Sequence, residues 1–454
     1  MNNTKRIAII GAGAAGVHMA VGLKKRGFTD IVIFEKSHRI GGKTQSINQN
    51  GLSHEMGTTA FAMSKGAALE LLIRDIFPEL EGVSYRTNIQ TITKNTYLKS
   101  KSKRTTRFAK ISKLATFMYA RYRFYKIYNR LVKKGYPYQT NSDDREMLML
   151  LGESLKSFLL RHKLNVIYRV LRSRFAAYGY GKMEQLPAYY GILLLERNYL
   201  SNCEYLMFNE GNDLLWKAAV EKYAINVELN TSVTQLNYSE NNKSSLEIRK
   251  GQVVTEEQFD AVFLTVPYAF TTQLPEPISK VFKEVKHYQY LSTLIEMSKR
   301  DQTNRYYMAE YPKYNPDRFD YDIVMAANFS KIKNTSNIKW AEENGTHVCF
   351  QLNDNENNRS FNQDLVIQQL EQQIKERFDR AKGLDKVLEA THWDRYFPHL
   401  TSEVIQKGGL QTINKEQGKY GIYYTGGSIS GELVSLVVEY NQHILQNIID
   451  KQGL

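Results

Sequence analysis

Residues 7–44 read IAIIGAGAAGVHMAVGLKKRGFTDIVIFEKSHRIGGKT, and this stretch predicts a dinucleotide-binding βαβ unit. The apolar run Ile7–Ile10 favours a buried parallel strand, and it leads directly into Gly11, Gly13 and Gly16, which have the spacing G-x-G-x-x-G. In this pattern the first glycine permits a tight turn, the second lets the backbone approach a pyrophosphate, and the third lets the following helix pack closely on the sheet. The phosphates are expected at the N-terminus of that helix, where unpaired N–H groups favour an anion.

The residues after the glycine turn complete this unit. A helix is expected from Ala14 to about Arg26, and a second apolar strand, Ile31–Phe34, delivers Glu35 nineteen positions after Gly16. An acid in this place can accept hydrogen bonds from the ribose hydroxyls of an adenosine half. Because turn, helix, strand and acid follow in the expected order, binding of a dinucleotide is favoured over a βαβ unit that binds nothing.

The composition is ordinary for a soluble globular protein. The chain has 454 residues, of which 42% are hydrophobic and 24% charged, enough for two substantial cores. We find no apolar run near the ~18 residues of a membrane helix and no leader pattern before the first strand, so neither secretion nor membrane spanning is expected. Cys203 and Cys349 are too few and too isolated for a disulfide framework or a thiolate metal site. The expected location is the cytoplasm, and no metal is expected.

The net charge of +14 comes from one segment. Residues 94–134 contain 14 Lys and Arg and no Asp or Glu, which leaves 47 basic and 47 acidic residues in the rest of the chain. Apolar and aromatic residues recur in this segment at spacings near 3.5 and predict an amphipathic helix with a basic, aromatic-rich surface: Phe108, Ile111, Met118, Tyr122 and Tyr125. Three interpretations compete, namely a solvated face, docking on an anionic membrane surface, and nucleic-acid binding. The last is not expected, because the chain has no recognisable nucleic-acid-binding pattern.

Two stretches after Glu35 resemble landmarks of the flavin amine oxidase superfamily. Arg39–Thr44 (RIGGKT) is similar to its R-x-G-G-[KR] extension, whose glycines pass close to the FAD pyrophosphate, and His54–Phe61 (HEMGTTAF) resembles the loop that passes the flavin ring. A simple nicotinamide dehydrogenase has no such extension, so the resemblance implies FAD. The cofactor is expected to be non-covalent, because neither cysteine lies in the C-terminal flavin loop.

Further resemblances complete the expected cofactor site. Val233 matches the position whose backbone meets the adenine, Phe259–Pro267 resembles the D-A-V-x-x-x-x-P strand, and Gly421–Ser428 resembles the C-terminal strand and glycine turn. Gly427 departs from the pattern, because an acid often binds the ribityl chain there, so that contact must come from Ser428, Ser430 or a backbone group, or be absent. The expected FAD-binding residues are Gly11, Gly13, Ala14, Ala15, Gly16, Glu35, Lys36, Arg39, Gly42, Lys43, Gly57, Thr58, Thr59, Val233, Gly426, Gly427 and Ser428.

The order of these patterns predicts an α/β fold with interleaved domains. A Rossmann-type FAD-binding domain, a parallel sheet with helices on both faces, is expected from residues 1–74, 205–274 and 390–454. Between its parts we expect a helical insertion over 75–204, which includes the basic segment, and an α+β substrate domain whose sheet spans 275–389. Within the insertion, one helix is expected over Met147–Leu160 and another over Lys163–Arg174.

Two narrower islands resemble the bacterial FAD-dependent polyunsaturated fatty acid isomerases. Phe175–Tyr190 contains FAAYGYG and LPAYY, similar to F-x-A-[FY]-G-Y-G…[VL]-P-A-x-Y, and Trp393–His399 (WDRYFPH) resembles W-x-x-Y-F-P-H. The resemblance implies that flavin N5 accepts a hydride from the methylene between two cis double bonds and returns it at another carbon. No catalytic side chain is expected. The expected substrate-pocket residues are Arg86, Phe175, Tyr178, Tyr180, Trp393 and Tyr424.

Each of these pocket assignments has a structural alternative. The aromatic residues suit ordinary core packing as well as a pocket wall, a surface salt bridge is commoner for Arg86 than a carboxylate clamp, and a packed structural role is commoner for His399 than proton transfer. Two other functions stay open. One is an amine oxidase or dehydrogenase that uses oxygen, with Trp393 and Tyr424 beside the flavin, and the other is a non-catalytic, FAD-stabilised module that docks on membranes. A fatty acid or other apolar substrate would favour peripheral docking on anionic membranes.

Overall fold

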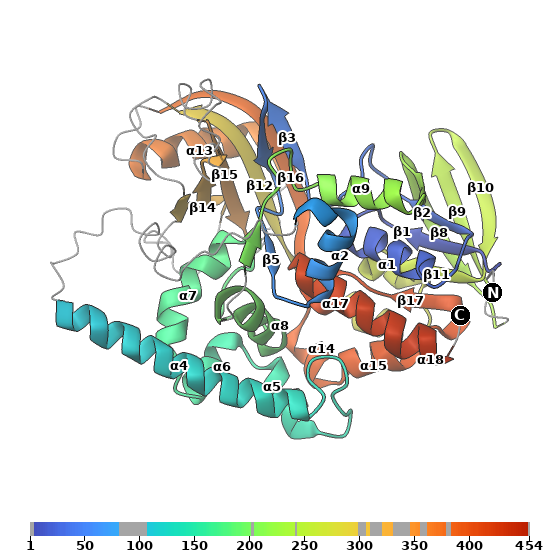
Figure 1. Ribbon diagram of the computed structural model, residues 1–454, viewed down its shortest axis with the longest axis horizontal. Coiled ribbons are helices and arrows are strands. Elements are labelled where there is room, and N and C mark those ends of the chain that lie inside the picture. The colour runs from blue at the N-terminus through green and yellow to red at the C-terminus, as the bar shows by residue number, and fades with distance from the viewer. Residues whose placement is uncertain are drawn as a thin grey trace.

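The computed structural model describes residues 4–80, 107–200, 204–240, 243–297, 306–308, 320–329, 346–354, 361–377 and 383–452 (Figure 1). These parts of the chain form two five-stranded sheets, with a group of helices along one side of the molecule. The expected α/β class is confirmed by the parallel sheet and its flanking helices.

The first sheet is parallel and has the strand order β17-β11-β1-β2-β7. Its strands are β1 (Ile7–Ile10), β2 (Ile31–Phe34), β7 (Asn226–Glu228), β11 (Ala261–Leu264) and β17 (Ile422–Tyr424). Every residue of β1, β2 and β11 is buried, as in a parallel sheet covered on both faces. Helices α1 (Ala14–Lys24), α9 (Leu214–Lys222) and α17 (Val434–Ile444) pack beside it (Figure 1). Strands from the beginning, middle and end of the chain therefore meet in one sheet.

An antiparallel three-stranded sheet is attached to this part of the molecule. It consists of β8 (Thr231–Tyr238), β9 (Ser244–Lys250) and β10 (Val253–Phe259), and it projects at the side where both termini lie (Figure 1). Strands β9 and β10 form a hairpin, with Gly251 in its turn at a φ of +62°. After β10 the chain enters β11 almost directly. This short connection attaches the three-stranded sheet to the parallel sheet.

The second large sheet is antiparallel, in the order β13-β14-β15-β12-β16. Its elements are β12 (Val285–Met297), β13 (Tyr306–Met308), β14 (Asp322–Ala327), β15 (Thr346–Asn353) and β16 (Leu384–Leu400), with helix α13 (Gln363–Arg377) packed on β14. Strand β16 has 17 residues and crosses the boundary expected at residue 389. As a result the motif Trp393–His399 belongs to a strand of this second sheet.

Helices make up most of the described part of the expected insertion. They are α4 (Arg107–Lys133), α5 (Arg145–Gly152), α6 (Leu155–Arg161), α7 (Asn165–Ala177) and α8 (Ala188–Leu194), continued by a π-helical turn over Leu195–Leu200. The single helix expected over Met147–Leu160 is wrong, because the chain breaks between α5 and α6. There Ser154 caps α6, with its hydroxyl oxygen accepting a hydrogen bond of 3.1 Å from the Ser157 N–H.

Helix α4 also differs from its expected pattern. Its buried face is formed by Phe117, Ala120, Phe124 and Leu131. Met118 and Tyr122, which the periodic pattern grouped with the apolar residues, are instead exposed by 45% and 55%. Met118 and Tyr122 therefore belong to the exposed surface of this helix, together with basic residues such as Lys126.

Short elements connect the larger ones. They are β3 (Ser46–Gln49), β4 (Leu52–Glu55), β5 (Phe61–Met63), β6 (Glu204–Leu206), α2 (Ala68–Ile76), α10 (Ile278–Lys283), α14 (Ser402–Gln406), α15 (Gly409–Glu416), α16 (Gly427–Ser430) and α18 (Asp450–Gln452), with 3₁₀ turns at Pro78–Leu80, Pro267–Gln273 and Lys419–Gly421 and a π-helical turn at Leu445–Ile449. Strands β5 and β6 pair across the insertion, so the helical region starts and ends at neighbouring points. Among the helices in the described ranges, none combines the length and the hydropathy that crossing a bilayer requires.

Candidate functional site

The three glycines of the first turn meet different constraints. Gly11 has a φ of +102°, and an added Cβ would lie 2.6 Å from Oγ1 of Thr265. A Cβ on Gly16 would overlap the carbonyl oxygen of Gly11, because α1 leaves the strand at very close range. Gly13 has ordinary extended dihedrals, and its Cβ would only touch Gly42 at 3.6 Å. The protein's own packing thus requires Gly11 and Gly16, whereas the bare backbone at Gly13 leaves room for a ligand.

A second glycine loop lies against this turn. The Gly41 N–H donates a 2.9 Å hydrogen bond to the Ala12 carbonyl, and the backbone of Gly41 bridges that of Gly13. A Cβ on Gly42 would lie 2.9 Å from Cα of Gly13. The two loops therefore form a continuous surface without side chains in front of the N-terminus of α1, where Ala14 and Ala15 begin the helix. Such a surface suits a pyrophosphate.

Glu35 is fixed at the edge of this surface. Its carboxylate accepts hydrogen bonds of 2.8 Å from the N–H groups of Ala12 and Ser37, one on each oxygen, and the residue is only 8% exposed. Since a carboxylate has about four acceptor positions, two remain for ribose hydroxyls. The Glu35 carbonyl also accepts a 2.9 Å hydrogen bond from the Thr231 N–H. This bond places the first residues of β8, which include Val233, next to Glu35. Lys36 is exposed at the start of the following loop.

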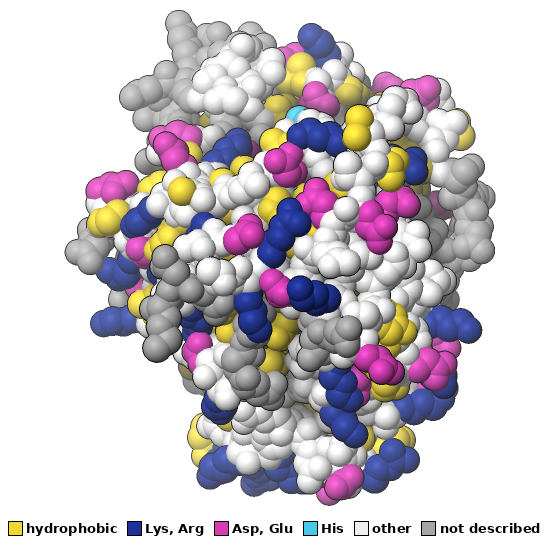
Figure 2. Space-filling model, turned by 90° about the vertical axis from the view of Figure 1, so that its right-hand side faces the viewer, with side chains coloured by type: hydrophobic (Ala, Val, Ile, Leu, Met, Phe, Trp, Pro, Cys, Tyr) yellow, Lys and Arg dark blue, Asp and Glu magenta, His cyan; other side chains and the backbone are white. Residues whose placement is uncertain are grey.

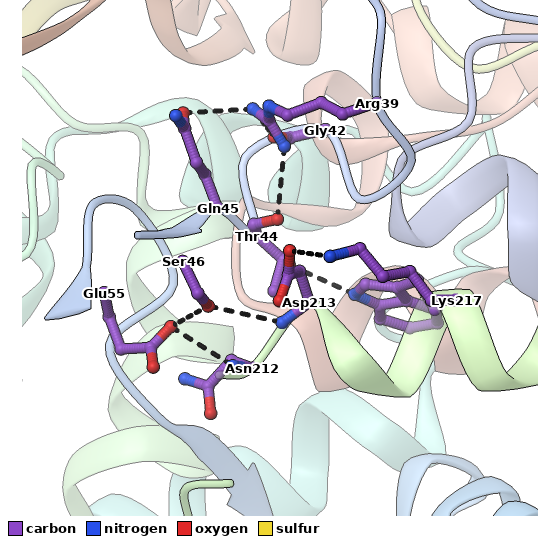
Figure 3. Close-up of polar contacts among 10 residues, drawn as sticks. Arg39, Gly42, Thr44, Gln45, Ser46, Glu55, Asn212, Asp213 and Lys217 are labelled. Carbon is purple, nitrogen blue, oxygen red and sulfur yellow. Dashed lines mark hydrogen bonds and ion pairs between the residues drawn. The ribbon is translucent and has the colours of Figure 1, made fainter. Parts of the chain in front are cut away.

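Arg39 holds the second glycine loop in shape (Figure 3). Its guanidinium donates to the Gly42 carbonyl at 2.6 Å, to Oε1 of Gln45 at 3.1 Å and to the Thr44 carbonyl at 3.4 Å. These bonds use three of the four N–H donors on the two terminal nitrogens. Arg39 therefore acts in this structure as a support for the loop.

A polar network ties this loop to the chain returning from the insertion (Figure 3). Oε2 of Glu55 accepts hydrogen bonds from Oγ of Ser46 at 2.6 Å and from the Asn212 N–H at 3.3 Å. Asp213 follows in this network, with its N–H donating to Oγ of Ser46 at 3.4 Å. The Trp216 ring N–H reaches Oγ1 of Thr44 at 3.1 Å. Sequence analysis missed these residues, because no local pattern marks side chains that act only as supports.

The Gly57 loop packs on the second glycine loop. A Cβ on Gly57 would overlap the Lys43 carbonyl, which accepts a 3.0 Å hydrogen bond from the Thr58 N–H. Strand β16 joins them, because the Trp393 ring N–H donates to the Met56 carbonyl at 3.1 Å. Gly57, Thr58 and half-buried Thr59 thus border both the cofactor loops and the second sheet.

The C-terminal turn closes the site from the other side. Gly426 has a φ of +99°, and a Cβ there would overlap the Thr265 carbonyl. Asn441 of α17 donates a 2.6 Å hydrogen bond to the Ala15 carbonyl and accepts one from Thr425, so α17 fixes both turns together. Asn441 was not predicted, because nothing in its neighbourhood in the sequence distinguishes it from other polar helix residues.

The serine hydroxyls of this turn indicate whether a polar ligand such as FAD can bind there. The single O–H donor of Ser430 is shared between the carbonyls of Gly426 and Gly431, which lie 3.2 and 3.1 Å from its Oγ. Oγ of Ser428 is buried and has no hydrogen-bond partner within the described part of the chain. A buried hydroxyl without a partner costs about 1–3 kcal/mol, which a ligand's polar group can offset. Together with the bare glycine surface and Glu35, this orphaned hydroxyl fits FAD.

An aromatic cluster brings the two narrow islands together beside these loops. The rings of Tyr180 and Phe397 lie 5.2 Å apart between centroids, and the Phe175 and Tyr180 rings 6.0 Å apart. A Cβ on Gly179, at a φ of +76°, would overlap the ring of Tyr396, so glycine is required there. The cluster is defined here as Phe175, Tyr178, Tyr180, Tyr288, Tyr290, Tyr396 and Phe397.

Lys43 connects the cluster to the glycine loops. Its Nζ lies 5.3 Å from the centroid of the Tyr396 ring, and it forms an ion pair with Glu432. Burial raises the pKa of Tyr180 and of Tyr396 far above the ordinary value, and the negative charge of Glu432 adds to the shift. Both phenols are therefore neutral, and the cluster is an uncharged wall next to the candidate flavin site.

The remaining predicted residues lie in different places. Trp393 packs against the Gly57 loop, whereas Tyr424 is buried in β17 with its ring 6.1 Å from Phe282. No aromatic ring pair in the described ranges joins these two residues. Arg86 lies outside the described residues. His399 is buried, its Nδ1–H donates to the Phe397 carbonyl at 2.8 Å, and burial lowers its pKa to about 4, so it is neutral and structural.

Comparisons with known proteins agree with this geometry. A family model described as flavin containing amine oxidoreductase matches residues 14–295, more than half of the chain. The polyenoic fatty acid isomerase of Ptilota filicina is 22% identical over 323 residues, which cover 65% of this chain and 64% of that protein. The coproporphyrinogen III oxidase of Staphylococcus aureus is 40% identical, but over only 18% of this chain and 19% of its own length. The chain thus spans less than two thirds of these relatives.

Two solved structures share the architecture throughout. The CLA-producing fatty acid isomerase from P. acnes has a TM-score of 0.77 and 19% identity, with 98% of each chain covered. Putrescine oxidase has a TM-score of 0.63 and 14% identity, with 99% of this chain and all of that chain covered. At these identities the likeness establishes the fold, and the two structures have different activities.

Proposed function

Because this chain belongs to the family of flavin-containing amine oxidoreductases, we propose that it is an FAD-dependent enzyme that isomerises double bonds of a polyunsaturated free fatty acid. The observation that carries the proposal is the aromatic cluster, which joins residues 175–181 to 393–399 next to Lys43 of the glycine loop. When bound, FAD supplies a planar acceptor that can take up a hydride and return it. No other redox group is needed, because substrate and product have the same oxidation state.

The chain's own residues would bind and shield the reactants. Glu35 and the two glycine loops would hold the adenosine and pyrophosphate parts, and Gly57 and the C-terminal turn would help to hold the flavin part. The aromatic cluster excludes water and offers an apolar wall to the hydrocarbon chain. Since the Tyr180 and Tyr396 phenols stay neutral, no tyrosinate is available there to act as a base. Arg86 is the proposed clamp for the carboxylate of the substrate.

Amine oxidation is the competing function. A protonated amine needs a negative charge in the pocket, and Glu432 is the carboxylate whose charge reaches the cluster tyrosines. Its ion pair with Lys43 leaves no net charge for an amine. The charge balance of this ion pair favours the isomerase.

The two functions are separated by their products. Purified FAD-loaded protein is incubated in air with linoleate in one series and with putrescine in another, and conjugated-diene absorbance and hydrogen peroxide are both recorded. The isomerase proposal expects diene absorbance from linoleate without peroxide. Peroxide from putrescine without a diene from linoleate would instead establish the oxidase. Bound FAD without turnover of either compound would support the non-catalytic alternative for these substrate classes.

We also propose that α4 docks the protein on anionic membranes, where free fatty acids partition. Helix α4 runs along the lower edge of the molecule (Figure 1). Tyr119 is 61% exposed and Tyr122 55%, and Nζ of Lys126 lies 4.9 Å from the centroid of the Tyr122 ring. On the side of the molecule where both termini lie, charges of both signs are mixed (Figure 2). Aromatic and basic side chains on one exposed helix suit an anionic interface.

Vesicle co-sedimentation tests the docking proposal. Each basic residue near an anionic surface contributes about 1 kcal/mol, so changing the exposed Lys126, Arg130 and Lys133 to Gln should weaken binding about a hundredfold at low salt. A matched variant changes three exposed lysines outside α4, Lys280, Lys375 and Lys407, to Gln, and should bind like the wild type. Equal weakening of vesicle binding by both variants would show that the attraction depends only on the protein's net charge. Absence of vesicle binding by the wild type would refute docking.

A further inference from the structure

Glu432 occupies the space beside Gly427, the position where the resemblance leads one to expect an acid. A Cβ added to Gly427 would lie 2.8 Å from Oε2 of Glu432 and 3.6 Å from its Cα. Gly427 is not among the glycines with positive φ, so space and not backbone conformation requires a glycine there. A side chain at 427 and the present position of Glu432 therefore exclude each other.

An ion pair fixes this carboxylate at the junction of the cofactor loops. Oε1 of Glu432 pairs with Nζ of Lys43, and the two side chains are 12% and 30% exposed. Lys43 directly follows Gly42, whose backbone touches that of Gly13. The pair thus links the C-terminal turn to the glycine surface, across 389 positions of sequence.

The second oxygen of this carboxylate lacks a partner. Oε2 of Glu432 is buried and accepts no hydrogen bond from any described residue. Leaving a buried charged oxygen without a donor is costlier than leaving a neutral one, so a donor from a ligand is expected. The charge of Glu432 also raises the pKa of Tyr268, after the larger effect of burial, as it does for the cluster tyrosines. The carboxylate therefore lies between the glycine loops and the aromatic cluster.

We propose that Glu432 accepts a hydrogen bond from a ribityl hydroxyl of bound FAD, the contact for which Gly427 has no side chain. Lys43 holds the carboxylate through Oε1 and leaves Oε2 for the ligand. The buried hydroxyl of Ser428, next to Gly427, offers a second polar group to the same part of the cofactor. The inference depends on the flavin assignment and is independent of the substrate.

The test is equilibrium binding of FAD to apoprotein, followed by flavin fluorescence, which requires no turnover. Since a hydrogen bond to a charged group contributes strongly, Glu432→Ala should weaken FAD binding about ten- to hundredfold. The control is Glu439→Ala, which removes another mostly buried carboxylate, paired with Arg197 at 2.9 Å, and should leave FAD affinity within about twofold of wild type. Thermal unfolding of each apoprotein verifies that it is folded.

Synthetic FAD analogues that each lack one ribityl hydroxyl identify the contact. The analogue that lacks the hydroxyl bound by Glu432 should bind the wild-type protein weakly. It should bind Glu432→Ala with the same affinity, because the hydrogen bond to Glu432 is already absent. In the double variant Gly427→Glu with Glu432→Ala, the acid moves to position 427 and should regain affinity over Glu432→Ala. Wild-type FAD affinity in Glu432→Ala, or an equal loss for FAD and for every analogue, would overturn the proposal. Neither result would bear on the isomerase reaction, which is measured separately.

Discussion

At the scale of single residues, neighbouring glycines of one motif have separate physical functions. Gly16 is required by the close approach of α1 to the Gly11 carbonyl, whereas the backbone at Gly13 has extended dihedrals that any residue can adopt. The space in front of Gly13 is needed only by a ligand. This difference allows loss of the fold to be separated from loss of the cofactor.

Replacing Gly13 by Val should give a folded, colourless protein. The added side chain meets Gly42 at an ordinary distance, so the free energy of unfolding of the apoprotein should change by about 1 kcal/mol or less, while the pyrophosphate loses its place. Flavin absorbance of the purified protein and denaturant unfolding measure the two effects. Gly16→Val is the contrast and should impair folding itself. A yellow Gly13→Val protein with normal FAD content would contradict the assigned cofactor site.

His399 should make stability depend on pH. Its pKa falls to about 4 in the folded state, chiefly through burial, with Lys286 and His287 lowering it further and its bond to Phe397 opposing them. Because the unfolded value is 6.5, the unfolded state binds more protons between these values, and stability is lost as pH falls from about 6.5 to about 4.

The expected loss from this group is about 3 kcal/mol, measured by denaturant unfolding of the apoprotein. His399→Phe lacks the titrating ring, so the difference in unfolding free energy between wild type and variant should shrink by this amount over the same pH range. Burial also lowers the pKa of His18, to about 3. Because His18 is present in both proteins, its contribution cancels in the difference between their unfolding free energies. A difference that does not vary with pH would show that folding leaves the pKa of His399 unchanged.

At the scale of elements, α4 combines a buried and an exposed aromatic face on one helix. Phe124 is fully buried, whereas Tyr122, two residues away, is 55% exposed. A helix needs only one of these faces for folding. The other is then available for a surface function such as docking.

Alanine substitutions should separate the two faces of α4. Phe124→Ala removes a buried ring and should lower the free energy of unfolding by about 3–5 kcal/mol. Tyr122→Ala removes an exposed ring and should change it by about 0.5 kcal/mol or less, while weakening vesicle binding. Equal destabilisation by both substitutions would mean that the outer face of α4 is covered in solution.

Helices and strands that are marked by a pattern of neighbouring residues were predictable. Those that depend on pairing with distant parts of the chain were not. Strand β2 has the expected bounds, because its apolar run is buried on both faces. The long strand β16 was missed, because it alternates irregularly and includes Pro398, and its pairing partner β12 lies about 100 residues away. The break at Ser154 could have been predicted from its capping pattern, since a serine there competes with continuation of the helix.

At the scale of the whole molecule, the site is assembled from segments that are far apart in sequence. Lys182 of the helical region and Asp354 at the end of β15 form a buried ion pair at 3.2 Å, which fixes the insertion on the second sheet. Motif residues such as Gly13 and Glu35 were predictable, because short-range spacing encodes them. Glu432 and Asn441 were not, because their roles depend on tertiary contacts with Lys43 and Ala15.

The most direct test of the account is turnover of linoleate under strictly anaerobic conditions. Isomerisation is redox-neutral, so FAD-loaded protein should form conjugated diene over many turnovers per bound flavin at the same rate as in air. Gly13→Val, which lacks the cofactor, should form none. A conjugated triene, which has lost two hydrogens relative to linoleate, formed to about one equivalent per flavin and formed further only when oxygen is admitted, would contradict the isomerase assignment and establish an oxidase.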